Sequence, residues 1–421
     1  MPRRVSDERS CWCLAATPHG LSQLLLSRSE SLPVHIHILD SQRGSRIYGV
    51  NDEPESEYLG ESVMMALEFH LDRICTLNIE SSGIEGDLIF SILDLWSKRG
   101  NASILGSLVL NWGWYLRIGD LCITRQSEIG KKIESMSPDL SALHLRHIMF
   151  SWESIVYRGL LDLQIDIDDI SISRPQLANI LTACPALTTL KLSHLRIKNT
   201  NEWSQPPILM QHLEFVNLVC MESRDVNSVL STITLPGPRA ELGIKDSPGG
   251  ALDSELAGFF GRSKVATLYY TCHPCEGGCD GCINNRGCEG GSSKALELFT
   301  QHLPHAQTFI LHKGTLNLLR VNRASTLQAL LTPLQPWLPQ LILLECTVNF
   351  EALKRLVLEA NIQELRLERC TTAHHSVPDL QQQELKVIRA SLQETYPHLR
   401  CWISDIDSTK QLACRTMFYS D

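Results

Sequence analysis

The sequence predicts an α/β solenoid, in which parallel strands form a curved sheet and helices line its outer side. Three observations lead to this prediction. A short apolar phrase recurs about a dozen times along the chain, its spacing is nearly constant in the central part, and strand-like segments alternate with helix-like ones. Such alternation favours parallel pairing, with each unit burying its apolar face against its neighbours.

The recurring phrase is close to L-x-x-L-x-L. Its clearest copies are Leu187-Leu190-Leu192-Leu195, Leu213-Val216-Leu218-Met221, Leu338-Leu341-Leu343-Cys346 and Ile362-Leu365-Leu367-Cys370. Weaker copies centre on Ile79, Leu110, Leu145, Ile165, Ile244, Tyr270, Leu311 and Ile403. Aligned on the last residue of each L-x-L core, the steps from Ile165 onward are 27, 26, 26, 26, 41, 32, 24 and 36 residues. A step near 26 is typical of leucine-rich repeats, so we expect an irregular leucine-rich-repeat solenoid.

The first 60 residues differ from the rest of the chain. Leu21, Leu24 and Leu25 share one helical face, Val34 to Ile38 alternates like a strand with one buried side, and residues 40–57 are polar and typical of a loop. We therefore expect a helix–strand lead-in over residues 1–60. The solenoid is expected over residues 61–421.

Within residues 61–421, strand and helix signals follow one another. Ser173 and Asn349 are candidate helix caps, and Pro175 lies in the first turn after Ser173. The expected elements are a strand over 74–79, helices over 87–98 and from Ser173 to 183, a helix over 293–303, helices over 351–360 and 377–394, and a strand over 398–403.

Composition narrows the possible functions. Apolar residues make up 43% of the chain and charged residues 20%, which favours a large core over disorder. The formal net charge of −9 disfavours electrostatic binding of nucleic acid or of an anionic membrane. No signal-peptide pattern and no stretch of about 18 apolar residues occurs, so we expect a cytoplasmic or nuclear protein. Most of the fifteen cysteines are expected to be buried, reduced thiols.

A cysteine- and glycine-rich segment occupies the longest step. Cys272, Cys275, Cys279 and Cys282 form two C-x-x-C pairs separated by three residues, and Cys288 follows. Zinc sites built from two such pairs need a longer spacer, so an insertion over residues 272–293 without metal is favoured. A structural zinc site remains an alternative, as does redox or cluster chemistry. The spacing Cys275-x3-Cys279-x2-Cys282 resembles, over eight residues, the iron–sulfur triplet of radical SAM enzymes. A metal-binding or redox-responsive function through this segment is the alternative to the main prediction.

No catalytic constellation stands out. The chain lacks G-x-S-x-G, H-E-x-x-H and G-x-G-x-x-G motifs, and no nucleophile has a recognisable base. His35 and His37 share a strand face without further metal ligands in the pattern, so they are expected to be surface or half-buried histidines. We expect neither an enzyme nor a bound cofactor.

The chain resembles the leucine-rich-repeat portion of F-box proteins, in particular the irregular families of mushroom-forming fungi. The resemblance rests on residues 24–36, where three leucines and Arg28-Ser29 precede Leu32-Pro33 and a strand. It extends over the phrases Leu187 to Leu195, Leu213 to Leu218 and Ile362 to Cys370. The L-P-x-E opening of an F-box is not found before residue 20. The resemblance implies a protein-interaction scaffold, either a substrate-recognition subunit of a ubiquitin ligase or a remnant of one.

The phrase also predicts where a partner would bind. The leucines of L-x-L point into the solenoid, so the residue between them lies on the concave face. This central column comprises Asn78, Val109, His144, Gln164, Lys191, Asn217, Gly243, Tyr269, Ile310, Ile342, Arg366 and Trp402. Its last members, from Tyr269 to Trp402, are expected to form an exposed hot spot for an unknown protein partner. The alternative is that the C-terminal tail, residues 405–421, covers the last strands and buries Trp402 as a cap.

Overall fold

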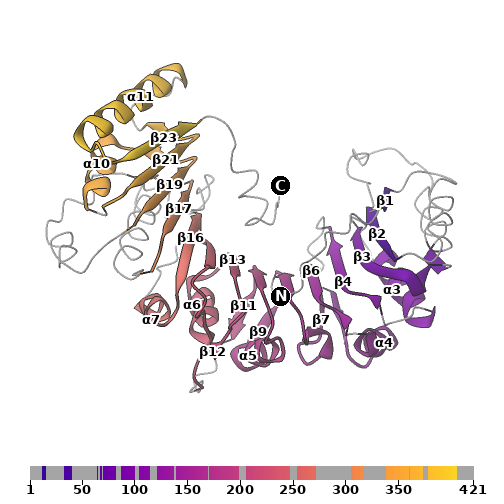
Figure 1. Cartoon of the computed structure of the whole chain (residues 1–421). Coiled ribbons are helices and arrows are strands. Elements are labelled where there is room, and N and C mark those ends of the chain that lie inside the picture. Colours follow the sequence, from indigo (N-terminus) through magenta and orange to yellow (C-terminus); the bar gives the residue numbers. More distant parts are fainter. Residues whose placement is uncertain are drawn as a thin grey trace, which may run out of the picture. The chain divides into compact units, whose positions relative to one another are not determined.

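The structure is a computed structural model of the chain (Figure 1). It describes residues 12–15, 33–39, 64, 67–68, 70–81, 87–99, 104–113, 121–136, 139–168, 170–198, 205–246, 254–271, 305–313, 315–316, 338–359, 361–372 and 378–404. The chain divides into two compact units, Met1–Leu187 and Thr188–Asp421.

The first unit contains a parallel sheet. Its strands pair in the order β1 (Trp12–Ala15), β2 (Val34–Leu39), β3 (Ile74–Ser81), β4 (Ser107–Trp112), β6 (Ala142–Arg146) and β8 (Asp162–Asp166). Between them lie η1 (Leu71–Arg73), α3 (Asp87–Arg99), α4 (Glu128–Met136) and η4 (Ile155–Tyr157), and α5 (Arg174–Ala183) follows β8. The short strands β5 (Leu121–Ile123) and β7 (Ile148–Phe150) pair with each other, and β9 spans Ser171–Ser173.

The second unit repeats the same plan. Its sheet runs β10 (Thr189–Ser193), β13 (Phe215–Met221), β15 (Ala240–Asp246), β16 (Val265–Thr271), β17 (Thr308–His312), β19 (Gln340–Leu344), β21 (Glu364–Glu368) and β23 (Arg400–Ser404), all parallel. Its helices are α6 (Ser223–Thr232), α7 (Ser254–Arg262), α10 (Phe350–Glu359) and α11 (Pro378–Thr395). Short strands complete it: β11 (Arg196–Lys198), β12 (Ile208–Leu209), β14 (Ile233–Thr234), β18 (Thr315–Leu316), β20 (Thr347–Val348) and β22 (Thr371–Thr372).

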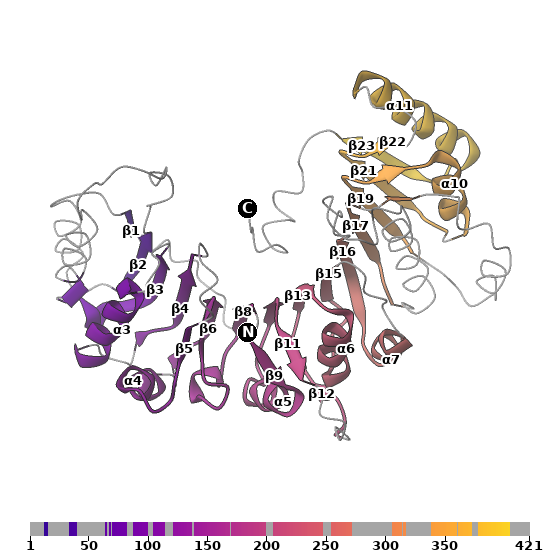
Figure 2. The same cartoon turned by 180° about the vertical axis from the view of Figure 1, so that it is seen from behind.

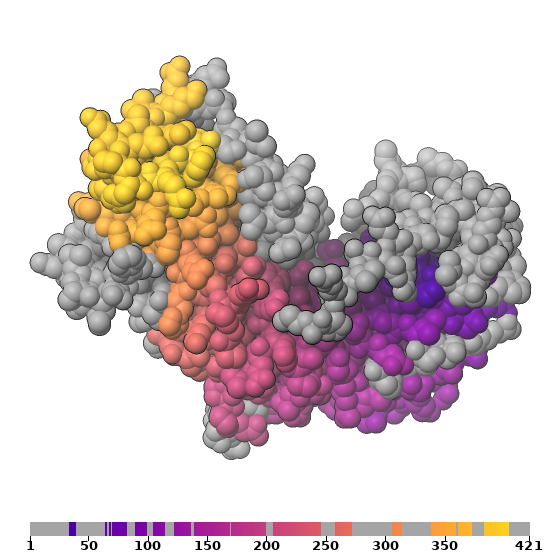
Figure 3. Space-filling model, in the orientation of Figure 1, coloured from indigo at the N-terminus to yellow at the C-terminus, as the bar shows by residue number. Residues whose placement is uncertain are grey.

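Strands and helices form separate layers in each unit. In both views the helices lie along one side of their own unit's strands (Figures 1 and 2). The colours in the space-filling view change in bands along each unit, because each strand–helix segment packs against its neighbours in sequence (Figure 3). The predicted α/β class with a large parallel sheet is therefore confirmed.

The apolar phrase forms the core of both units. The last leucines of successive copies are partners in register, as in Leu110–Leu145–Ile165 and in Leu311–Leu343–Leu367. These side chains are all buried. Stacking at the roughly 4.8 Å spacing of paired strands makes a continuous apolar column, which stabilises each strand only when its neighbour is present.

A left-handed backbone turn follows many of the strands. The residue two positions after the last leucine has a positive φ between 50° and 57° in several repeats: His147, His194, Cys220, Lys313, Glu345 and Arg369. This conformation is unfavourable for residues other than glycine. Its cost is offset by hydrogen bonds to the next strand, because the N–H of His194 donates to the carbonyl of Val219 and that of Glu345 to the carbonyl of Glu368.

Helix boundaries agree with the sequence signals where those signals were clear. The Ser173 side chain accepts a hydrogen bond from the N–H of Gln176, whose own side chain accepts one from the Ser173 N–H, which is a complete capping box. Asn349 accepts from the N–H of Ala352 at 3.2 Å and caps α10 as predicted. Helices α3 and α11 and strand β3 also match their predictions, whereas β1, α4, α6 and α7 were not predicted.

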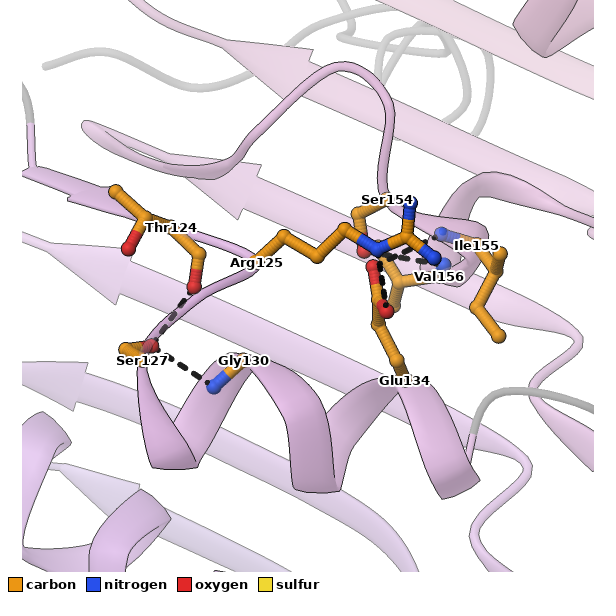
Figure 4. Close-up of polar contacts among 8 residues, drawn as sticks. All are labelled: Thr124, Arg125, Ser127, Gly130, Glu134, Ser154, Ile155 and Val156. Atoms are coloured by element: carbon orange, nitrogen blue, oxygen red, sulfur yellow. Dashed lines mark hydrogen bonds and ion pairs between the residues drawn. The ribbon is translucent and has the colours of Figure 1, made fainter.

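Helix α4 begins at a tight turn that explains one glycine (Figure 4). The Ser127 hydroxyl donates to the carbonyl of Thr124 at 2.8 Å and accepts from the Gly130 N–H at 3.0 Å. A Cβ atom on Gly130 would overlap the Thr124 carbonyl oxygen, so the helix start approaches this carbonyl too closely for any side chain. Near the helix end, Glu134 pairs with Arg125 at 3.1 Å and accepts from the Ile155 N–H, which joins α4 to η4.

Several predictions fall outside the described residues. These are the helix around Leu21 to Leu25, the polar loop 40–57, the cysteine-rich insertion over 272–293 and the helix over 293–303. Strand β2, which the sequence placed in a separate lead-in, pairs in register with β3 of the same sheet. No helix of the described part of the chain is both long and apolar enough to cross a membrane.

Candidate interaction surface

The central column predicted from the phrase is in register within each unit. In the first unit Asn78 pairs with Val109, Val109 with His144 and His144 with Gln164. In the second unit the partners run Lys191, Asn217, Gly243, Tyr269, Ile310, Ile342, Arg366 and Trp402. Because side chains alternate along a strand, these residues share one sheet face, opposite to the buried leucines. We call this the strand face.

The exposure of the column differs from the prediction at two positions. Ile310 and Ile342 are only 3% and 5% exposed, so the expectation of an exposed aliphatic pair is wrong. Part of the reason is that in-register side chains on neighbouring strands lie about 4.8 Å apart, and the larger Tyr269 and Arg366 flank the two isoleucines. Both isoleucine side chains are therefore buried between their neighbours, and their predicted role in partner binding stays untested.

Trp402 is the largest exposed side chain of the column. It is 54% exposed, whereas the alternative in which the C-terminal tail buries Trp402 as a cap stays untested. The proposed covering segment, residues 405–421, lies outside the described residues. Tyr269 is half-buried, and the Arg366 side chain is 42% exposed. Among the five predicted contact residues, therefore, Tyr269, Arg366 and Trp402 are accessible.

A second column runs beside the central one, two residues earlier on each strand. Its in-register members in the second unit are Thr189, Phe215, Glu241, Thr267, Thr308, Gln340, Glu364 and Arg400. Sequence reasoning did not select these residues, although a strand's two-residue period places them on the same face. Selecting the residue two positions before the central one in each copy of the phrase would have identified them.

A chain of polar contacts links this second column to Arg366. The Thr308 hydroxyl donates to the Gln340 side-chain oxygen at 2.9 Å, and the Gln340 side chain in turn hydrogen-bonds to Glu364. Arg366 donates its Nε proton to Glu364 Oε1 at 2.8 Å, and an Arg400 guanidinium nitrogen lies 3.7 Å from Glu364 Oε2. Glu364 therefore holds Arg366 by hydrogen bonding and lies near the charge of Arg400 on the neighbouring strand.

The charge state of Glu364 is consistent with this role. Burial alone would raise the pKa of its carboxyl group. The hydrogen bonds from Arg366 and Gln340, together with the attraction of both arginines, outweigh burial and hold the pKa below its ordinary value. Glu364 is thus ionised at neutral pH and restrains Arg366, which reduces the side-chain entropy that Arg366 would lose on binding a partner.

The C-terminal end of the strand face therefore presents an aromatic ring beside two arginines. Trp402 is the in-register partner of Arg366, and Arg400 lies two residues before Trp402 on the same face of β23. Arg400 has a side chain that is 69% exposed. Tryptophan and arginine are the residues most enriched in binding hot spots, because both combine a large contact area with directed hydrogen bonds. We call Arg366, Arg400 and Trp402 the Trp–Arg patch.

The strand face of the first unit carries histidines that hydrogen-bond to polar side chains of neighbouring strands. His35 hydrogen-bonds to Thr76 at 2.8 Å, His37 to Asn78 at 3.1 Å and His144 to Asp162 at 2.9 Å. His35 and His37 are half-buried, as the sequence predicted. The residues that the structure describes contain no group of three or more His, Cys, Asp or Glu arranged to hold a metal ion. Cys272, Cys275, Cys279 and Cys282 lie outside the described residues.

Comparisons with known proteins do not assign the chain to a family. No family model matches the sequence, and a search among curated proteins finds no match. The geometry of the strand face is therefore the basis for a functional proposal.

Proposed function

We propose that the chain is a protein-interaction scaffold of the leucine-rich-repeat type, without catalytic activity of its own, and that the Trp–Arg patch binds a protein partner. The observation that carries the proposal is that Arg366, which Glu364 restrains, shares one sheet face with exposed Arg400 and Trp402. Exposed apolar surface beside prearranged donors is typical of interface centres, since little conformational entropy is lost on binding.

The leucine-rich-repeat assignment has its own support. The copies of L-x-x-L-x-L form in-register parallel strands, and the residue three positions after the last leucine turns into the core in the repeats ending at Cys346 and Cys370. Both thiols donate to a carbonyl of the preceding strand, Cys346 to Leu311 and Cys370 to Leu343. The leucine-rich-repeat consensus has Asn or Cys at this position.

The partner class follows from the charge of the patch. Arg366 and Arg400 together carry two positive charges against the single carboxylate of Glu364. A partner segment with a carboxylate next to an apolar side chain complements this arrangement. The resemblance of the repeats to those of F-box proteins supports a more specific proposal, that the partner is a substrate of a ubiquitin ligase.

The direct experiment is quantitative affinity purification from the native host with three forms of the chain. The first is wild type, and the second carries Arg366→Ala and Trp402→Ala. The third is a matched control with Leu358→Ala and Val387→Ala on helices α10 and α11, whose side chains are 64% and 67% exposed. Proteins retained by wild type and control but lost with the second form support the proposal. An identical set of proteins with all three forms overturns it.

The ubiquitin-ligase part is tested separately with the partner so identified. Deletion of the chain should lengthen the half-life of that partner and reduce its ubiquitylation, and wild-type chain should restore both. A partner whose half-life and ubiquitylation do not change on deletion rejects the ligase role and leaves the binding role standing.

A further inference from the structure

Two buried cysteines occupy equivalent positions in neighbouring repeats. Cys346 follows β19 and Cys370 follows β21, each three residues after the last leucine of its phrase. Both lie between in-register pairs: Leu344 pairs with Glu368 before them, and Thr347 pairs with Thr371 after them. The Thr371 N–H also donates to the Cys346 carbonyl at 2.8 Å, which fixes the alignment of the two turns.

This alignment brings the two thiols together. Equivalent residues of adjacent parallel strands are about 4.8 Å apart, within the 4.4–6.8 Å range of Cα separations that a disulfide spans. The sulfur of Cys346 is within hydrogen-bonding reach of the Cys370 thiol. Both cysteines are free thiols.

The two sulfurs are not equally accessible. Cys346 is fully buried, whereas Cys370 is 7% exposed. The contact with the Cys346 side chain outweighs burial and lowers the pKa of the Cys370 thiol. Cys370 is thus the more accessible of the two sulfurs, and its lowered pKa favours the thiolate form.

We propose that Cys346 and Cys370 are an oxidative modification site, at which hydrogen peroxide converts the two thiols into a disulfide between neighbouring repeats. The Cys370 thiolate attacks one peroxide oxygen, the O–O bond breaks, and hydroxide leaves, giving a sulfenic acid. The Cys346 sulfur then attacks the Cys370 sulfur, the S–O bond breaks, and water leaves with the Cys346 proton. In total, two thiols and one peroxide give one disulfide and two waters.

The bond would join the turn after β19 to the turn after β21, the strand that carries Arg366. Both thiols already donate hydrogen bonds to backbone carbonyls, so a structural role in the reduced protein is compatible with the proposal. The register of the two turns and the contact between the two thiols are independent of the proposed partner binding.

Peptide mapping of the full chain tests the proposal. Reduced protein is treated with a small excess of hydrogen peroxide, free thiols are alkylated under unfolding conditions, and the non-reduced tryptic digest is analysed by mass spectrometry. The two cysteines fall in different tryptic peptides, because Lys354 and Arg369 lie between them. A linked pair of these peptides that disappears with dithiothreitol is the expected result.

Serine variants provide the control. Cys370→Ser retains a hydroxyl that can donate to the Leu343 carbonyl, and it should leave Cys346 fully alkylated after peroxide treatment. Cys184→Ser, which removes a buried thiol of the first unit bonded to the Tyr157 carbonyl, should leave the linked peptides unchanged. Recovery of Cys346 and Cys370 as free thiols from oxidised wild type, or of Cys370 as sulfinic acid with Cys346 still free, overturns the proposal.

Discussion

The side chain of Asn217 occupies the space that a Cβ atom on Gly243 would fill. The two residues are register partners on β13 and β15, and the Asn217 Cγ atom lies 3.2 Å from that Cβ position, with Oδ1 closer still. Asn217 is only 3% exposed, so its amide has little room to move away. A glycine in the middle of a buried strand, which is usually unfavourable, is thus explained by a neighbouring side chain.

Gly243→Ala should therefore destabilise the protein. The added methyl group must displace a buried amide, and such overpacking typically costs about 1–3 kcal/mol. Gly261→Ala in helix α7 is the matched control, since nothing lies within 4 Å of its Cβ position and alanine favours helix. Urea denaturation of both variants measures the difference. Equal stability of the Gly243 variant and wild type would show that Asn217 moves freely.

The buried carboxyl group of Asp225 predicts how the stability of the protein depends on pH. Asp225 Oδ1 accepts from the Ile197 N–H at 3.0 Å, and the side chain is 1% exposed. Burial raises the pKa of this carboxyl group above its ordinary value of 3.8, although the bond from Ile197 and the nearby Arg224 oppose the shift. The folded state thus binds the carboxyl proton of Asp225 more tightly than the unfolded state does. The stability that this proton contributes is lost as the pH rises through the pKa of the folded state.

Asp225→Asn should accordingly be at least as stable as wild type at pH 7, because it keeps the acceptor and removes the buried charge. Its advantage should shrink as the pH falls toward 3.8. Asp225→Ala should lower the free energy of unfolding by about 1–3 kcal/mol both at pH 7 and near pH 3.8, because the Ile197 N–H loses its acceptor. Denaturation curves at several pH values distinguish these outcomes. An Asn variant less stable than wild type at pH 7 would mean that the charge itself is needed.

His312 gives a prediction in the opposite pH direction. Its Nε2 atom lies 3.4 Å from Glu345 Oε2, and burial lowers its pKa below 6.5 even though Glu345 pulls it upward. The unfolded chain then binds more protons just below pH 6.5, so this contribution to stability is lost as the pH falls from 6.5 toward the folded pKa. His312→Gln should remove that part of the pH dependence. If the stability of this variant falls as steeply below pH 6.5 as that of wild type, the pH dependence arises from a group other than His312.

The capping box at the start of α5 supplies a stability test in the first unit. Ser173→Ala removes both the acceptor for the Gln176 N–H and the hydroxyl bonded to the Gln176 side chain. Loss of such a cap costs about 1 kcal/mol. Ser135→Ala, on the exposed side of α4, is the control and should be nearly neutral. Thermal unfolding monitored by circular dichroism is sufficient, and a Ser173 variant as stable as the control would contradict the assignment of the cap.

Much of this fold follows from the sequence because its determinants are local. The L-x-L spacing specified both the buried leucines and the register of the central column, since a one-residue slip would turn every leucine outward. Ser173 and Asn349 marked helix starts for the same reason, as each cap bonds a backbone group three residues away. Helix α6 was missed because its buried side carries Ser223, Asp225 and Asn227, so the apolar stripe that usually indicates a helix is interrupted.

The candidate site was only partly predictable. The pattern placed Arg366 and Trp402 on one face but did not reveal that Glu364 restrains Arg366, because that contact depends on the chosen side-chain conformations. It also predicted exposure for Ile310 and Ile342, although exposure depends on what surrounds a side chain in space. Similarly, the pairing of Cys346 with Cys370 follows from register and was hidden by the more conspicuous cysteines of residues 272–293.

The central claim, that the Trp–Arg patch binds a protein partner, is tested most directly by calorimetric titration of the purified partner. The titration compares wild type with the single variants Arg366→Ala, Arg400→Ala and Trp402→Ala, which change the three residues of the patch, and with Leu358→Ala as the control on α10. We expect each strand-face variant to weaken binding by 1 kcal/mol or more, about fivefold in Kd, with unchanged stability. Unchanged Kd values for all three, together with weaker binding by the Leu358 variant, would contradict the account and place the site on the helical side.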